Sequence, residues 1–264
     1  RSLIPTILIN MIPHDKHLAI TLFNRLCNVD DDILLQTPYI EKFVYYNLKD
    51  NFRDVSNIIH RMLLSPNTDV NVVGAMAVSY ASLILGDELP ELRFSLYNSK
   101  YHRLGVAKAF VDYLPYSNSI SLVKNILPML FSDPSEEVRS VASTCFKKID
   151  NNNIKDYEDL IRDFIYNSSG TFKALIYSLN KIIDLPDITI EVCEQFFKLI
   201  NNSKVPKNGV GTSATAMKVS ELVFRLYGQT KNNETRLRCL DLIDCMLKKH
   251  IPKIERTLSQ YEND

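Results

Sequence analysis

The 264-residue sequence contains no tryptophan and only seven glycines. Extended sheets need tight turns, and tight turns rely on glycine for backbone conformations that other residues avoid. The scarcity of glycine therefore argues against a sheet-rich fold. Lys and Arg total 31, and so do Asp and Glu, which makes the formal net charge zero. A dedicated nucleic-acid binder usually carries a basic excess, and this chain has none overall.

Motifs for catalysis, cofactors and metal binding are also missing from the sequence. There is no GxxxxGK[ST] phosphate loop, no HExxH and no CxxC. The five cysteines are widely spaced and odd in number, which argues against a disulfide framework and favours a reducing compartment (Cys27, Cys145, Cys193, Cys239 and Cys245). The longest apolar stretch, 72–85, is interrupted by polar residues and too short to span a bilayer. No signal peptide is visible, so we expect a cytoplasmic chain without a membrane partner, cofactor or catalytic residue.

Helical periodicity recurs along almost the whole chain, separated by short Asn, Asp, Ser and Pro segments. The expected helices are 3–12, 15–28, 37–49, 51–64, 69–85, 88–97, 101–114, 117–132, 135–149, 154–167, 171–185, 188–202, 212–227, 233–250 and 253–261. Side chains that can accept free backbone N–H groups precede several of them, namely Asp15, Thr37, Asp69, Ser117 and Asp133. Pro38 and Pro134 fit the first helical turn. The sequence predicts an all-α fold.

The apolar pattern repeats at a spacing that two packed helices and their turns require. In 135–149 the apolar slots hold Val138, Val141, Ala142, Cys145, Phe146 and Ile149. Equivalent slots recur earlier and later in the chain, beginning at Val73, Arg103, Phe172 and Ala216. A single hairpin cannot bury its own apolar face, so neighbouring hairpins must stack on it. We therefore expect one helical-repeat domain over 1–264, clearest over 51–185, with an insertion loop near 202–211 and capping helices over 233–261.

One unit, 122–149, resembles a HEAT repeat. The matching features are the Leu and Ile rows of its first helix, Pro128, Asp133 at the turn, and the Val138-Arg139 pair followed by Ala142. The resemblance implies an α-solenoid of stacked antiparallel hairpins. In HEAT proteins the turn Asp and the Arg commonly form a ladder between repeats. The slot of Arg139 holds Gly74, Leu104 and Lys173 in the other units, so a regular ladder is not expected.

The C-terminal segment 236–264, RLRCLDLIDCMLKKHIPKIERTLSQYEND, is similar to the closing helices of large bacterial P-loop signalling NTPases of the STAND type. In those proteins helical repeats follow the ATPase module, and some act as sensors in antiphage defence. The resemblance implies that this chain, which begins with Arg1 and not with Met, is the sensor region of a larger protein.

Three short segments carry residues that could bind an ion, and each has a plainer interpretation. His14 and His17 could hold a metal, but Asp15 between them is expected to cap a helix and leave His14 outside it. The loop 207–213 contains two glycines before a helix, a weak match to a phosphate loop, with Thr212 or Ser213 expected as the cap. The carboxylates 30–32 lack the spacing of a calcium loop and fit a helix start.

The remaining candidate site is a row of mostly basic side chains beside the buried rows of the second helices. We call this row the basic stripe, and it comprises Lys108, Arg139, Lys147, Lys148, Lys173, Tyr177 and Lys181. Such a face could bind an acidic peptide, a protein or a nucleic-acid backbone. It could equally be a solvated face whose Lys and Arg stems cover apolar surface.

The sequence thus favours a non-catalytic protein-binding scaffold or sensor. Two other functions stay open. A HEAT-like DNA glycosylase would use a concave basic groove with aromatic residues and an acidic catalytic group, but the zero net charge and the lack of tryptophan weigh against it. A structural spacer or trafficking adaptor has no specific sequence feature in its favour. The oligomeric state is left open.

Overall fold

The computed structural model describes residues 3–28, 32–116, 120–167, 172–180, 185–202, 210–249, 251 and 254. Helices make up most of these ranges and no strand occurs within them, so the predicted all-α class is confirmed. The chain divides into two compact units, Arg1–Cys145 and Phe146–Asp264. We call them unit 1 and unit 2 and describe each by itself. In a repeat protein each hairpin contacts mainly its neighbours, so a division into two units does not decide whether the chain is one repeat domain. The expected single domain stays a prediction.

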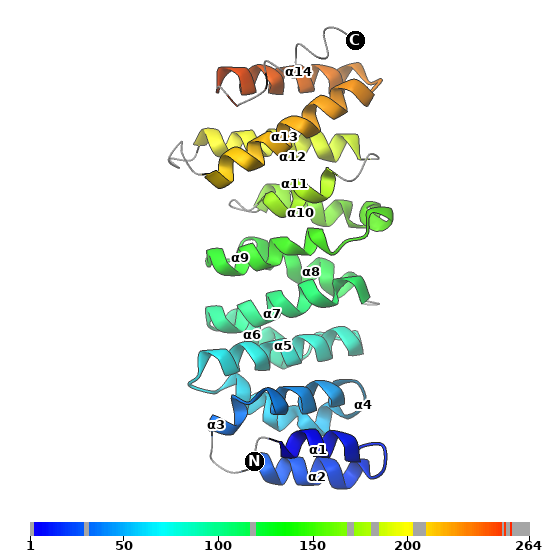
Figure 1. The fold of residues 1–264 in the computed structure, drawn as a ribbon, viewed down its shortest axis with the longest axis vertical. Coiled ribbons are helices and arrows are strands. Elements are labelled where there is room, and N and C mark those ends of the chain that lie inside the picture. Colours follow the sequence, from blue (N-terminus) through cyan, green and yellow to red (C-terminus); the bar gives the residue numbers. More distant parts are fainter. Residues whose placement is uncertain are drawn as a thin grey trace. The chain divides into compact units, whose positions relative to one another are not determined.

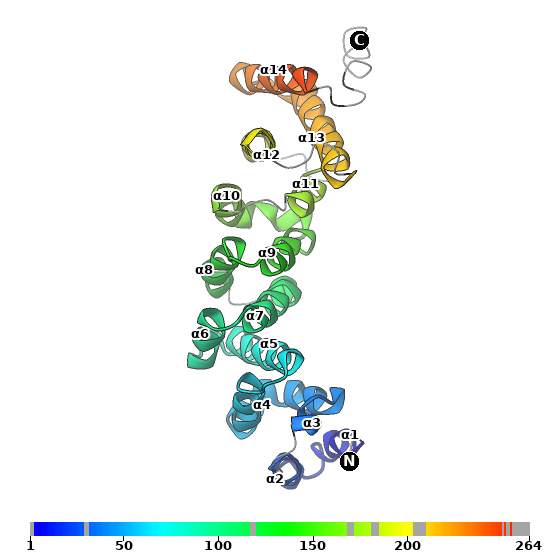
Figure 2. The same cartoon turned by 90° about the vertical axis from the view of Figure 1, so that its left-hand side faces the viewer.

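Unit 1 contains nine α-helices within the described residues (Figure 1). They are α1 Ile4–Met11, α2 Lys16–Cys27, α3 Asp32–Leu35, α4 Pro38–Leu63, α5 Thr68–Leu85, α6 Pro90–Tyr97, α7 Lys100–Tyr113, α8 Ile120–Phe131 and α9 Glu136–Ser143, with a 3-10 turn, η1, at Leu114–Tyr116. Helices α5, α7 and α9 form one layer, and α6 and α8 lie in a second layer beside it (Figure 2). Helix α7 therefore packs between α5 and α9 of its own layer and also contacts α6 and α8 of the other layer.

Unit 2 repeats the two-layer arrangement with less regular elements. A 3-10 turn, η2, spans Thr144–Lys147 and ends in unit 2, and a second, η3, covers Asn151–Tyr157. The α-helices that follow are α10 Glu158–Asn167, α11 Lys173–Leu179, α12 Pro186–Asn202, α13 Val210–Gln229 and α14 Asn233–Lys248. Helix α12 contacts α10, α13 and α14, and α11 packs on α13 (Figure 2). The helix expected at 253–261 lies outside the described residues, apart from Ile254.

Helix α4, Pro38–Leu63, consists of two helical segments that meet at a kink at Asn51, whose φ of −137° and ψ of 27° are not helical. This kink agrees with the prediction of two helices at 37–49 and 51–64. The Asn51 amide donates to the Asn47 side chain at 2.8 Å, and Asn47 donates to the carbonyl of Phe43 at 2.8 Å. Both asparagines are buried. The buried asparagine pair thus links the first segment of α4 to the kink.

The helix starts show which predicted caps are correct. Asp15 accepts from the Leu18 amide at 2.9 Å, as expected. At α5 the cap is Asn67, which accepts from two amides, whereas the predicted cap Asp69 lies inside the first turn. The predicted cap Asp133 is also wrong, because Ser135 occupies the position before α9.

Of the remaining residues predicted to start helices, some are correct and others are not. Thr37 does precede α4, but its hydroxyl donates to Leu34 O and caps no amide. Pro38 opens α4 as predicted, and Pro134 lies one residue ahead of the Ser135 cap instead of in the first turn. Ser117 lies outside the described residues.

Helix α5 is the core helix of unit 1. By length and composition alone this helix could cross a membrane, with 18 residues and a mean hydropathy of 1.4, which corrects the expectation that the apolar stretch 72–85 is too short. It packs against α4, α6 and α7, and most of its residues are buried among them. Gly105 of α7 lies so close to α5 that a Cβ there would sit 2.3 Å from the carbonyl oxygen of Val72. The apolar surface of α5 is therefore covered by protein.

Candidate functional site

The basic stripe lies beside the buried rows that the repeat predicts, on the second helix of each predicted helix pair. Val138, Ala142, Cys145, Phe146 and Ile149 are all buried, as are most of the equivalent residues of α7, α11 and α13. The side chains beside these rows are consequently the ones left at the surface. The stripe spans both units, so its members are described unit by unit.

In unit 1 the stripe consists of Lys108 on α7 and Arg139 on α9, both half-buried. Asp112 lies one turn after Lys108 and is exposed. Arg139 uses its guanidinium locally, because Nη1 donates to the carbonyl oxygens of Asp133 and Pro134 at 2.5 and 3.1 Å. Arg139 thus helps to close the turn between α8 and α9. Lys108 forms no ion pair with another described residue.

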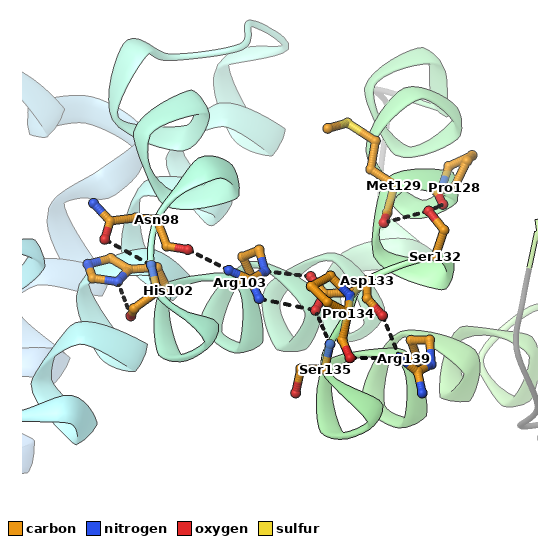
Figure 3. A network of polar contacts seen from close by, with 11 residues as sticks. Asn98, His102, Arg103, Pro128, Met129, Ser132, Asp133, Pro134, Ser135 and Arg139 are labelled. Atoms are coloured by element: carbon orange, nitrogen blue, oxygen red, sulfur yellow. Dashed lines mark hydrogen bonds and ion pairs between the residues drawn. The ribbon is translucent and has the colours of Figure 1, made fainter.

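Asp133 is the centre of a polar network that joins two hairpins of unit 1 (Figure 3). Its carboxylate, only 4% exposed, accepts from Arg103 Nε at 2.5 Å and from Arg103 Nη2 at 3.2 Å. Oδ1 also accepts from the amide of Ser135 at 2.7 Å. Arg103 occupies a slot that the sequence predicts to be apolar, and no regular ladder is expected. The structure links α7 to the turn between α8 and α9 through Arg103, whereas Arg139 donates to backbone carbonyls of that turn.

In unit 2 the described part of the stripe is exposed. Lys147 and Lys148 follow one another at the end of η2, and Lys173 and Tyr177 lie one turn apart on α11. Tyr177 is 40% exposed. Lys181 lies outside the described residues. The described stripe residues of unit 2 therefore lie beside buried residues of the same segments, such as Phe146 and Ile176.

Helix α13 adds charged residues that the sequence analysis did not include. The slots that hold Ser143 and Lys147 in the earlier repeat hold Glu221 and Arg225 here. Lys218 donates to Glu221 at 2.6 Å, and this hydrogen bond, ahead of the charge of Glu221, raises the pKa of Lys218, with a smaller contribution from nearby Tyr177. Arg225 donates to the carbonyl oxygens of Leu179 and Asn180. Applying the repeat register to 212–227 would have identified Glu221 and Arg225 as members of the same row.

The other candidate segments do not assemble a site among the described residues. His14 and His17 are exposed, and Asp15 between them is engaged as a cap. Within the described part of the chain, no group of three or more His, Cys, Asp or Glu side chains could hold a metal ion. Residues 30 and 31, and residues 207–209 of the candidate phosphate loop, lie outside that part. Helix α13 begins at Val210, so Thr212 and Ser213 are inside the helix and the prediction that either caps it is wrong.

A Ser–His contact occurs that the sequence analysis did not anticipate. Ser99 Oγ lies 2.7 Å from His102 Nδ1, and His102 Nε2 lies 2.8 Å from the carbonyl oxygen of Leu63. A carbonyl can only accept, so Nε2 carries the proton and a neutral ring leaves Nδ1 to accept from the serine hydroxyl. His102 is 4% exposed. The pair joins the start of α7 to the end of α4, and we interpret it as a structural link.

Comparison of the chain with models of known protein families, with curated proteins and with solved structures finds no match. The interpretation of the site therefore depends on its geometry.

Proposed function

We propose that the chain is a non-catalytic binding module built from HEAT-like hairpins, stacked as an α-solenoid, and that it recognises another protein. Support comes from the repeated buried rows, since each hairpin needs a neighbour to cover its apolar face. The module would be a scaffold or the sensor region of a larger protein, and the similarity of 236–264 to the closing helices of STAND-type NTPases favours a sensor.

The observation that carries this proposal is the exposure of charged and aromatic stripe residues on unit 2. Lys147, Lys173 and Tyr177 are exposed, and neither lysine forms an ion pair with another described residue. Tyrosine is a frequent anchor in protein interfaces, and charged side chains around such an anchor steer a partner of opposite charge. Their charge suits a partner segment that carries Asp or Glu.

Charge reversal on the complete chain tests this surface. A displayed peptide library is first selected on the unmodified protein, and enriched acidic peptides are synthesised with a fluorescent label. The double variant Lys147→Glu/Lys173→Glu should bind these peptides about tenfold more weakly, because two attractive charges become repulsive. The matched control is Lys155→Glu/Lys198→Glu, which makes the same change in charge at exposed positions of η3 and α12.

Three results would contradict the proposal. Equal loss in both double variants would mean that only net charge matters. Full binding by the stripe variant, with unchanged helicity by circular dichroism, would place recognition elsewhere. Tight binding of duplex DNA that weakens steeply with salt would favour the nucleic-acid alternative, since phosphate contacts release counterions.

A further inference from the structure

Hydrogen bonds join the three segments of unit 2 that carry exposed lysines and a tyrosine, namely η2, α11 and α13. The hydroxyl of Ser178 on α11 donates to the carbonyl oxygen of Phe146 in η2 at 2.5 Å. Asn180, also on α11, donates to the carbonyl oxygen of Lys218 on α13 at 3.4 Å. Arg225 of α13 donates back to the carbonyl oxygen of Asn180 at 2.5 Å. Helix α11 is therefore hydrogen-bonded to both of its neighbours.

These bonds place four side chains on one surface, which we call the lysine–tyrosine cluster and which comprises Lys147, Lys173, Tyr177 and Lys218. Lys147 directly follows the residue of η2 that accepts from α11, and Tyr177 directly precedes the donor. Tyr177 lies one turn after Lys173, and it is close enough to Lys218 to interact with it electrostatically. The Tyr177 residue is 40% exposed and the Lys218 side chain 37%. A ring thus lies among three ammonium groups.

Lys218 differs from the other two lysines because it has a partner on its own helix. Its Nζ donates to Oε2 of Glu221, one turn later on α13, at 2.6 Å, and the Glu221 side chain is 53% exposed. Lys147 and Lys173 form no ion pair with another described residue. An ion pair this exposed contributes little free energy. Another carboxylate can therefore replace Glu221 with little loss.

We propose that a partner segment lies across η2, α11 and α13, and that one of its carboxylates takes the place of Glu221 on Lys218. This inference rests on the proposed function and names the residues that set its affinity. The Tyr177 ring offers a rigid anchor for an apolar side chain, and the lysines around it attract Asp or Glu beside that side chain. A lysine ammonium has rotatable donors on a flexible stem, so Lys218 can turn from Glu221 to the partner.

The test measures fluorescence anisotropy of the labelled acidic peptides, selected as described for the basic stripe, on variants of the complete chain. Lys218→Met keeps an apolar stem and should bind about fivefold more weakly, because one attractive charge is lost. The control Lys198→Met removes one charge at an exposed position of α12 and should bind within about twofold of the unmodified chain. Glu221→Gln should bind about threefold more tightly, since nothing then competes for Lys218.

The double variant Lys218→Met/Glu221→Gln separates competition from general repulsion. If Glu221 acts by holding Lys218, its removal should leave the affinity of the Lys218→Met chain within about 1.5-fold. An equal gain in both backgrounds would mean that Glu221 only repels the peptide, and would overturn its role as a competitor. Equal weakening by Lys218→Met and Lys198→Met would overturn the role of Lys218.

These failures can be told apart from failure of the proposed function. In both cases the variant Lys147→Glu/Lys173→Glu would still lose affinity, which would keep the basic stripe as a binding surface and remove only its extension to α13. Full binding by that variant, or a selection that enriches no acidic peptide, would overturn the stripe and the extension together.

Discussion

At the scale of single residues, Asp133 matters more for the stability of unit 1 than its position in a turn suggests. It is nearly inaccessible, it neutralises Arg103 and it accepts the Ser135 amide. A buried carboxylate is costly unless such partners are present. The Arg103 side chain, 17% exposed, depends equally on Asp133. The two charges are therefore useful to the fold only as a pair.

We expect Asp133→Asn to lower the free energy of unfolding by about 2 kcal/mol, because the amide still accepts from Ser135 but leaves the Arg103 guanidinium without its counter-charge. Urea unfolding followed by circular dichroism measures the change. The control Glu137→Gln removes the exposed pair with Lys100 at 3.5 Å and should cost less than about 1 kcal/mol. Equal effects of the two substitutions would mean that burial of the Asp133 pair has no special weight.

At the scale of elements, close packing between α5 and α7 depends on the absence of a side chain. Gly105 allows the two helices to touch, since a Cβ would meet Val72 O at 2.3 Å and Ala75 Cβ at 2.8 Å. The first of these neighbours is backbone, which cannot turn aside as a flexible side chain can. The fit between the helices thus has no room for even one methyl group.

The substitution Gly105→Ala should destabilise the protein by about 2 kcal/mol or more, because α5 and α7 must move apart and lose their contacts. Thermal and urea unfolding would measure this loss. Gly86→Ala serves as the comparison: Gly86 ends α5 with a φ of 79°, so alanine there is strained by about 1 kcal/mol without any clash between helices. A smaller effect at Gly105 than at Gly86 would contradict the close approach.

Most helices could be predicted from the sequence, because their apolar periodicity and local caps such as Asp15 are encoded within a few residues. The errors have physical causes. The predicted cap Asp69 lies inside α5, because Asn67 two residues earlier accepts the first free amides instead. Arg103 was assigned to an apolar row because a register compares slots and does not reveal a partner thirty residues later.

The candidate site was predictable only in part, for the same reason. Exposure of Lys147 and Lys173 follows from the repeat and agrees with expectation. The ring contacts of Tyr80 with Tyr45 and with Tyr113 were not predictable, because the three residues come from different helices, α4, α5 and α7. Tyr80 in particular occupies a slot that sequence comparison treats as ordinary core.

At the scale of the whole chain, the five cysteines report on packing in both units. Cys27, Cys145, Cys193 and Cys239 are buried, and Cys245 is half-buried. Burial raises the pKa of Cys27 to about 12 and that of Cys239 to about 11, and it raises the pKa of Cys193 still more. A thiol reacts with alkylating reagents as the thiolate, so these thiols should be unreactive in the folded chain.

Brief iodoacetamide treatment of the folded protein at pH 8 should therefore modify Cys245 first, and denaturant should expose all five thiols, as mass spectrometry of the peptides would show. The unfolded thiols ionise near pH 8.5 and the buried ones only at higher pH, so the free energy of unfolding should fall as the pH rises above about 9. Rapid labelling of Cys193 in the folded chain would contradict the packing of α12 on α14.

One helix end in each unit accepts a hydrogen bond from a side chain much later in the sequence. In unit 1, His102 donates to Leu63 O, 39 residues earlier, and Asn71 donates to the same oxygen. In unit 2, Arg225 donates to Leu179 O, 46 residues earlier. On a ribosome the earlier helix would emerge before this later donor had left the exit tunnel. Each of these helix ends would then gain its last hydrogen bond only after further helices had been synthesised.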